Sequence, residues 1–151
     1  MAEDTQQEVL AGRLRSAQLK VTAPRIAVLG VLSGHGHLDA DSVFSAVTQQ
    51  LPKTSLQAVY GVLSALVTSG LVRKIEPAGS PALYEARVGD NHHHLVCMNC
   101  KRVEDVDCVI GESPCLTPSN LHGFAVQVAE ITFWGVCSSC QAATAELEPT
   151  S

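Results

Sequence analysis

The sequence predicts an α+β fold in which an N-terminal winged helix-turn-helix domain precedes a small α/β domain with a four-cysteine zinc site. Two observations predict this arrangement. Four amphipathic segments and then a hairpin pattern fill the first half of the 151 residues, which is the element order of a winged helix. Two Cys-x-x-Cys pairs occupy the second half, at 97–100 and 137–140. We therefore expect two domains, residues 1–86 and 87–151, with a hinge at about 84–91.

The first two helices are predicted from apolar residues at helical spacing. Residues 7–19 show this spacing, and residues 21–34 carry a longer apolar stripe. In the second segment Thr22 has the side-chain oxygen that an N-cap needs. Pro24 suits the first helical turn, because its missing N–H would have no partner there. Gly34 ends the pattern.

The third and fourth helices are predicted from signals of the same kind. Asp39 is expected to cap a helix over 40–51, and Pro52 stops that helix. Thr54 or Ser55 is expected to cap the fourth helix, which ends at the glycine of "VTSG".

A two-stranded hairpin is predicted directly after the fourth helix. Residues 71–77 and 82–88 read as its strands, separated by the turn "AGSP". In a winged helix, the fourth helix would lie in the major groove of DNA and the hairpin would touch phosphates. The alternative is an ordinary core helix with a solvated face. The polar face of this helix presents Ser55, Gln57, Tyr60, Gly61 and Ser64.

Charge is distributed unevenly along a chain whose net charge is −5. Residues 1–87 hold eight Lys/Arg against seven Asp/Glu, a balance of +1, and residues 88–151 hold two against eight, a balance of −6. The first half is therefore the one that can approach an anionic partner. No apolar run approaches the roughly 20 residues of a membrane helix, and no secretory signal is visible. We expect a cytoplasmic protein without a membrane partner.

The paired knuckles at 97–100 and 137–140 are the surest feature of the second half. Each knuckle can turn two thiolates toward one point, so the pair supplies the four sulfurs of a tetrahedral structural zinc site. A metal would also stabilise a segment that is too short to build a large core. A redox dithiol or an iron–sulfur cluster is the alternative. Cys108 and Cys115 read as small half-buried residues, with a sensing thiol as the alternative.

Three consecutive histidines precede the first knuckle in a segment that reads as a β-strand. Because side chains alternate across a strand, His92 and His94 share a face with Cα atoms about 6.6 Å apart. His93 then points to the opposite face. The two imidazoles on one face can reach a single metal ion, and a solvated histidine cluster is the alternative.

Carboxylates lie on either side of these histidines in the sequence. Glu85 precedes them, and "RVEDVD" follows on what reads as the next strand. Alternation places Asp105 and Asp107 on one face of that strand and Glu104 on the other. Nitrogen and oxygen donors of this type suit Fe(II), Mn(II) or Zn(II).

The chain is similar to the ferric uptake regulator (Fur) superfamily in four stretches that keep the family's order over nearly the whole length. They are "LKVTAPR", "TSLQAVYGVLSALVTSGLV", "LYEARVGDNHHHLVCMNC" and "WGVCSSC". The stretch "LVRKIEPAGSPALYEARVGDNHHHLVC" is especially similar to the actinobacterial FurA-type subgroup, PerR-like repressors of a catalase-peroxidase gene and of their own gene. The resemblance implies a homodimeric, metal-dependent DNA-binding repressor whose C-terminal domain mediates dimerisation.

The resemblance also implies two metal sites. The structural zinc ligands would be Cys97, Cys100, Cys137 and Cys140. The interdomain regulatory site, for Fe(II) or Mn(II) with Zn(II) as a substitute, would use His37, Glu85, His92, His94 and Asp105. An Asp at position 105 matches the peroxide-sensing members and implies Fe(II)-catalysed oxidation of His37 or His92. The spacing from Glu85 to His92 is one residue longer than in those members.

A third family site is matched only in part, because "VAEITFW" replaces the segment with its downstream histidine. A divergent site could use His93, Glu112, His122 and Glu130. On the DNA side, Tyr60 matches the recognition-helix tyrosine, Lys20 a lysine that reaches the minor groove, and Arg25 a phosphate contact. The expected DNA-contacting residues are Lys20, Arg25, Ser55, Gln57 and Tyr60. The family's Thr-Val-Tyr-Arg is Ala58-Val59-Tyr60-Gly61 here, so an Arg and a hydroxyl are missing.

The expected function is a metal-dependent, peroxide-responsive transcriptional repressor that binds a two-fold-symmetric operator in double-stranded DNA. Its expected targets are a catalase-peroxidase gene and its own gene. The alternatives are an iron-, zinc- or manganese-responsive Fur-type repressor without peroxide sensing, and a metal-handling protein that binds no DNA. A metal-dependent hydrolase could use the same donors, but no signature such as His-Glu-x-x-His occurs, so we do not expect an enzyme.

Overall fold

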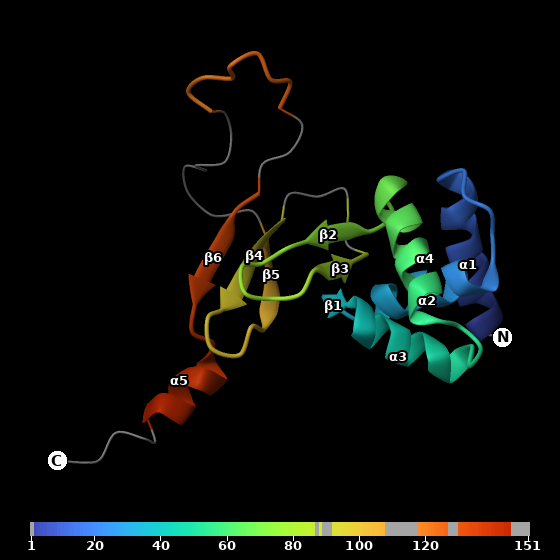
Figure 1. Ribbon diagram of the computed structural model, residues 1–151, viewed down its shortest axis with the longest axis horizontal. Coiled ribbons are helices and arrows are strands. Elements are labelled where there is room, and N and C mark those ends of the chain that lie inside the picture. The colour runs from blue at the N-terminus through green and yellow to red at the C-terminus, as the bar shows by residue number, and fades with distance from the viewer. Residues whose placement is uncertain (1, 87, 89–91, 108–117, 127–129, 146–151) are drawn as a thin grey trace. The chain divides into compact units, whose positions relative to one another are not determined.

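The computed structural model confirms the predicted α+β class (Figure 1). The chain divides into two compact units, Met1–Asp90 (unit 1) and Asn91–Ser151 (unit 2). No helix in the described part of the chain is long and apolar enough to span a membrane. The structure describes residues 2–86, 88, 92–107, 118–126 and 130–145.

Unit 1 begins with four helices, whose bounds largely follow the predicted caps. They are α1 (Ala2–Ser16), α2 (Ala23–Gly34), α3 (Ala40–Gln50) and α4 (Leu56–Thr68). Thr22 accepts a hydrogen bond from the backbone N–H of Arg25 at 3.5 Å, and Asp39 accepts one from Ser42 at 2.7 Å. Ser55, rather than Thr54, caps α4. The predicted caps of α2 and α3 are confirmed, and the choice at α4 is resolved.

Helix α1 differs from the predicted range of 7–19 at both ends. It starts earlier, because Glu3 and Asp4 in its first turn interact favourably with the positive end of the helix dipole. It stops at Ser16, and the chain then takes a left-handed conformation at Gln18, with φ at 59°. An α-helix cannot continue through such a residue.

The core of unit 1 orients α4. Val59, Leu63 and Leu66 on its inner face are fully buried and pack with residues of α2 and α3. Burial of each such side chain contributes about 1.5–3 kcal/mol. The opposite face of α4 is thereby held outward. Its exposed residues are Gln57, Ala58, Tyr60, Gly61, Ser64 and Thr68.

A three-stranded sheet completes unit 1, in the order β1-β3-β2. The predicted hairpin is present as β2 (Arg73–Ile75) and β3 (Leu83–Glu85), shorter than the predicted 71–77 and 82–88. Strand β1 (Leu38–Asp39) was not predicted, because two residues carry no detectable alternation. It pairs with β3 in the antiparallel register Leu38 to Tyr84.

The described part of unit 2 contains a second three-stranded sheet, in the order β5-β4-β6, and one helix. The predicted strands are present as β4 (His92–Cys97) and β5 (Val103–Asp107), which pair antiparallel. Strand β6 (Thr132–Gly135) pairs parallel with β4 on its other side. Helix α5 (Ser138–Ala145) follows and has no buried residue, so no amphipathic pattern marks it in the sequence.

Candidate metal centres

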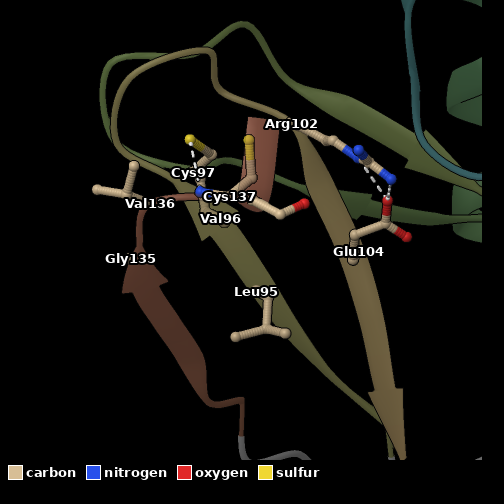
Figure 2. A pocket seen from close by; sticks show the side chains of 9 residues that line it. Leu95, Val96, Cys97, Arg102, Glu104, Gly135, Val136 and Cys137 are labelled. Atoms are coloured by element: carbon tan, nitrogen blue, oxygen red, sulfur yellow. Dashed lines mark hydrogen bonds and ion pairs between the residues drawn. The ribbon is translucent and has the colours of Figure 1, made fainter. Parts of the chain in front are cut away.

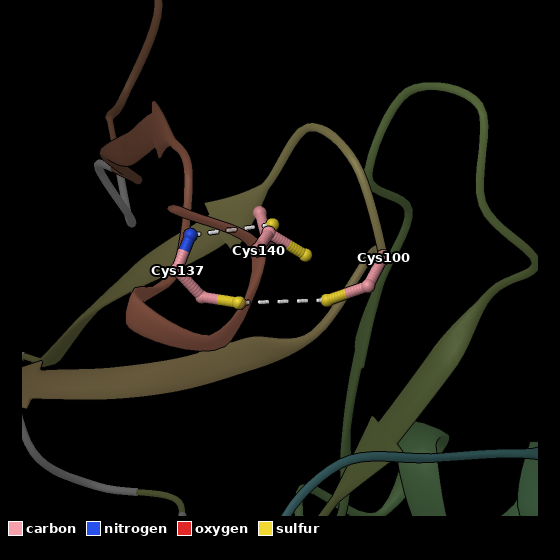
Figure 3. A group of neighbouring side chains, drawn as sticks. Cys100, Cys137 and Cys140 are labelled. Atoms are coloured by element: carbon pink, nitrogen blue, oxygen red, sulfur yellow. Dashed lines mark hydrogen bonds between the residues drawn. The ribbon is translucent and has the colours of Figure 1, made fainter. Parts of the chain in front are cut away.

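The four knuckle cysteines form one cluster in unit 2. The sulfurs of Cys97, Cys100, Cys137 and Cys140 all lie within 4.8 Å of one another. Figure 3 shows Cys100 and Cys137 with their sulfurs turned toward each other, 3.8 Å apart, and Cys140 beside them. Ligands at the corners of a tetrahedron with metal–sulfur bonds of about 2.3 Å are also about 3.8 Å apart. The donor type and spacing therefore fit a structural zinc ion.

The sheet of unit 2 brings the two knuckles together despite their separation in sequence. Strand β4 ends at Cys97, and parallel pairing places Gly135 of β6 opposite that residue. The second knuckle begins two residues later, at Cys137, whose backbone N–H donates to the sulfur of Cys97 at 3.4 Å. Lys101 closes the first knuckle with a left-handed turn, φ 65°. The parallel edge strand is thus the element that builds the cluster.

The thiols of the cluster differ in pKa. The backbone N–H groups of Cys137 and Cys100 lower the pKa of Cys97 to about 6. Hydrogen bonding with the thiol of Cys137, and then burial, raise the pKa of Cys140 to about 12. Four neighbouring thiols cannot all ionise without a compensating positive charge, because like charges repel. A divalent cation supplies that charge, which agrees with the zinc interpretation.

In unit 1, strand β1 places His37 beside Glu85. The register that pairs Leu38 with Tyr84 brings the residue before Leu38 next to the residue after Tyr84. The Nε2 atom of His37 lies 2.7 Å from Oε2 of Glu85, and both side chains are at least 95% buried. On the other side of β3, Arg73 is the cross-strand partner of Glu85. Glu85 therefore lies between a histidine and an arginine.

In unit 2, the paired strands gather a second donor group. The Oδ1 atom of Asp105 lies 3.5 Å from Nε2 of His94 and 3.9 Å from Nε2 of His92. The two imidazoles meet edge to face, with ring centroids 4.9 Å apart. His94 and Asp105 are direct cross-strand partners, so they share a face of the sheet. This group has the mixed nitrogen and oxygen donors that suit Fe(II), Mn(II) or Zn(II).

His93 lies on the opposite face, as strand alternation predicted. Its ring stacks edge to face against Phe133 of β6, at a centroid distance of 6.4 Å. His122 is exposed, in a left-handed conformation with φ at 45°. Among the described residues, His93, His122 and Glu130 do not form a group of three donors. Glu112, like Cys108 and Cys115, lies outside the described residues.

A pocket of about 230 Å³ lies beside the four-cysteine cluster, lined in part by Cys97 and Cys137 (Figure 2). Its lining includes Leu95 and Glu104, which pair across the sheet on the face opposite His94. The carboxylate of Glu104 is bound by the guanidinium of Arg102. The pocket is thus separate from the histidine group, and the carboxylate that lines it is held in an ion pair rather than placed as a general base.

The residues expected to contact DNA lie at the surface of unit 1. Lys20 is exposed, and its carbonyl accepts a hydrogen bond from Nη1 of Arg25 at 2.8 Å, which ties the preceding loop to α2. On α4, Gln57 is exposed and Tyr60 is 49% exposed. The hydroxyl of Ser55 accepts a hydrogen bond from the backbone N–H of Ala58 and so has a capping role. The helix bears no charged side chain.

Sequence reasoning did not identify Arg73 as a neighbour of Glu85. Arg73 stands in the predicted hairpin, but its partner depends on the register of that hairpin, which the sequence pattern did not specify. No local signal marked β1 either, although this strand positions His37. Only the family resemblance pointed to His37.

The sequence was compared with protein families and with known proteins. The family model described as "Ferric uptake regulator family" matches residues 16–133. The transcriptional regulator FurA of Mycobacterium tuberculosis is 55% identical over 130 residues, covering 86% of this chain and 88% of that protein.

Two solved structures share the fold. A ferric uptake regulator from Pseudomonas aeruginosa with manganese has a TM-score of 0.64 and 25% identity, over 86% of this chain and 98% of that one. A zinc uptake regulator complexed with zinc and DNA has a TM-score of 0.63 and 21% identity, over 93% of this chain and 98% of that one.

Proposed function

Because the chain belongs to the ferric uptake regulator family, we propose that it is a metal-dependent transcriptional repressor that binds a two-fold-symmetric operator in double-stranded DNA as a homodimer. The proposal rests on the combination of two features in one chain. Helix α4 presents an outward, uncharged polar face on the winged-helix core of unit 1, and the chain also holds two groups of metal donors. The proposed DNA-binding domain is 1–86 and the proposed dimerisation domain is 87–151. The proposed compartment is the cytoplasm, where the thiols stay reduced.

Zinc at the four cysteines would be structural. Cys97 ends β4 and Cys140 lies in the first turn of α5, so a shared ion would hold the end of the strand and the start of the helix together. In the described part of unit 2 the fully apolar core is small, with Val96 as its largest buried aliphatic residue. Small domains with little core gain much of their stability from such metals.

The proposed regulatory site takes ligands from both units. Unit 1 offers His37 and Glu85, whose side chains already face each other at 2.7 Å. Unit 2 offers a second group of donors, His92, His94 and Asp105. When bound, Fe(II) or Mn(II) would supply the charge that joins the two groups, and Fe(II) would also supply the peroxide chemistry that oxidises a histidine. Zn(II) would substitute in binding.

Joining the two donor groups would favour one arrangement of the two DNA-binding domains. A ligand shifts a conformational equilibrium only as far as it prefers one state. His37 and Glu85 belong to the unit that carries α4, so their engagement with unit 2 would restrict where α4 can lie. The restricted arrangement is proposed to match two operator half-sites, which gives metal-dependent repression.

Peroxide sensing is the finer part of the proposal. It rests on Asp105, the carboxylate type found in the peroxide-sensing members that the sequence resembles, and on the nearness of its Oδ1 to His92 and His94. His37 and His92 are the proposed oxidation targets. A catalase-peroxidase gene and the protein's own gene are the proposed targets of repression.

Two copies of unit 2 are proposed to form the dimer. The described part of unit 2 exposes many large apolar side chains, and exposed apolar clusters commonly mark protein interfaces. They are Leu95, Met98, Leu121, Phe124, Val126, Phe133, Trp134 and Val136. A third metal site at His93, Glu112, His122 and Glu130 also remains a proposal.

Promoter binding tests the proposal against a metal-handling protein that binds no DNA. Protein purified without oxygen should bind its own promoter with Fe(II) or Mn(II) and should lose binding after peroxide only in the Fe(II) form. A repressor without peroxide sensing would keep binding in both forms. Failure of the metal-loaded protein to bind DNA at any salt concentration would refute the repressor function.

A further inference from the structure

Two histidines of β4 and two aspartates of β5 share one face of the paired strands. Three of these four residues are proposed metal ligands, and the fourth, Asp107, is not. His94 is the cross-strand partner of Asp105, and His92 is the partner of Asp107. Direct partners in an antiparallel pair share a face, with Cβ atoms about 4.5–5.5 Å apart. Asp107 therefore lies on the same face of the sheet as Asp105, directly across from His92.

The histidines turn their outer nitrogens toward Asp105. Its Oδ1 atom is 3.5 Å from Nε2 of His94 and 3.9 Å from Nε2 of His92. A metal bound by this group would be ligated through these Nε2 atoms. The second ring nitrogen of each histidine, Nδ1, then stays on the side of the ring that is nearer the backbone.

The carboxylate of Asp107 can approach Nδ1 of His92 more easily than Nε2. Nδ1 is bonded to the ring carbon that carries Cβ, so it remains close to β4 whatever the ring orientation. The side chain of aspartate is short, so the carboxylate of Asp107 remains close to β5. Across a Cβ separation of about 5 Å, an aspartate carboxylate reaches Nδ1 more readily than Nε2. Metal-ligating histidines almost always donate this second N–H to a carboxylate, carbonyl or water.

We propose that Asp107 is a positioning residue for the regulatory metal, which accepts the Nδ1–H of His92 and so presents Nε2 as the ligating atom. The inference rests on the proposed metal-dependent function and extends it to a residue outside the five proposed ligands. The carboxylate also adds a negative charge beside the bound cation. Outer partners of this kind typically change metal affinity by about 10- to 100-fold.

Glu104 provides a matched control on the same strand. Its cross-strand partner is Leu95, so it lies on the opposite face, and its carboxylate is bound by Arg102. Removal of either carboxylate changes the net charge equally. Only Asp107 should affect the regulatory metal.

The test compares Asp107→Ala, Asp107→Asn and Glu104→Ala with the unsubstituted chain, all as full-length, zinc-loaded protein. Mn(II) affinity is measured by competition with a chelator, and the His92 tautomer by ¹⁵N NMR at constant pH without Mn(II). Asp107→Ala should weaken Mn(II) binding by about tenfold or more and remove the Nδ1–H preference of His92. Asp107→Asn keeps an acceptor oxygen and should restore the tautomer but only part of the affinity. Glu104→Ala should match the unsubstituted chain within about twofold.

The results separate the inference from the proposed function. Unchanged Mn(II) affinity and an unchanged tautomer in Asp107→Ala would overturn the inference, as would an equal loss in Glu104→Ala. If the unsubstituted chain bound no Mn(II), the proposed function would fail. The His92 tautomer in the Mn(II)-free proteins would still decide whether Asp107 positions that ring.

Discussion

Gly61 offers a direct test of how α4 is used. The residue is exposed on the outer face of the helix, and a Cβ added there would meet nothing within 4 Å. Glycine in a helix interior costs about 0.5–1 kcal/mol relative to alanine. Gly61→Ala should therefore stabilise the protein by about that amount, without steric cost. For a cooperative unit of this size, 1 kcal/mol raises Tm by about 4–8 °C, so we expect a rise of about 2–8 °C.

Gly61→Arg adds a DNA test to the stability test. The new guanidinium would point outward from α4, where the described helix has no charge. If α4 lies in the major groove, one added phosphate contact per protomer should steepen the dependence of log K on log salt concentration by about 0.9, or about 1.8 per dimer. An added contact to guanine would also change operator preference.

Thermal denaturation and fluorescence anisotropy at several salt concentrations measure these effects, with Gly61→Ala as the control for helix propensity. A lower Tm for Gly61→Ala would mean that the surroundings of position 61 are not open. An unchanged salt slope for Gly61→Arg, in protein that still binds its promoter, would mean that α4 does not face DNA.

Two further substitutions test the metal centres. Cys100→Ser should lower zinc affinity by more than about 100-fold, because loss of a residue that only hydrogen-bonds to a metal ligand can already cost that much. It should also unfold unit 2, whereas the control Cys108→Ser should retain zinc. Full zinc content in Cys100→Ser, by metal analysis after dialysis, would refute the four-cysteine site. Asp105→Glu should weaken peroxide sensitivity more than DNA affinity, because the longer side chain moves the carboxylate from its place 3.5 Å from His94. Equal peroxide sensitivity of the two proteins in promoter-binding assays would contradict the role of Asp105.

Local chemistry explains which parts of the fold could be predicted. The caps at Thr22 and Asp39 were predictable, because a side-chain oxygen before an apolar stripe has few other uses. The faces of His92, His93 and His94 followed from the two-residue period of a strand, and β4 is present where the sequence placed it. Both inferences need only neighbouring residues.

The parts that could not be predicted depend on pairing between distant segments. Strand β1 has only two residues and exists because it pairs with β3, more than forty positions away. The parallel pairing of β6 with β4, which brings the knuckles together, leaves no local mark in "TFWG". The contact between His37 and Glu85 follows from the β1 register and could be anticipated only through the family resemblance.

Arg73 is a second neighbour of Glu85, besides His37. It is the partner of Glu85 across the β2–β3 pair, and His37 lies on the other side of the same carboxylate. A buried carboxylate requires compensation of its charge. Arginine keeps its positive charge at all relevant pH values, so it suits this role whether or not a metal is bound.

Metal-dependent binding to the protein's own promoter is the decisive measurement for the proposed regulation. It compares promoter affinity with and without Mn(II) in zinc-loaded protein, for the unsubstituted chain and for Glu85→Gln, which keeps the shape of the side chain but removes its charge. We expect at least a tenfold gain in affinity with Mn(II) for the unsubstituted chain, equivalent to about 1.4 kcal/mol, and a much smaller gain for Glu85→Gln. Equal promoter affinity with and without Mn(II) in the unsubstituted chain would contradict metal-dependent repression.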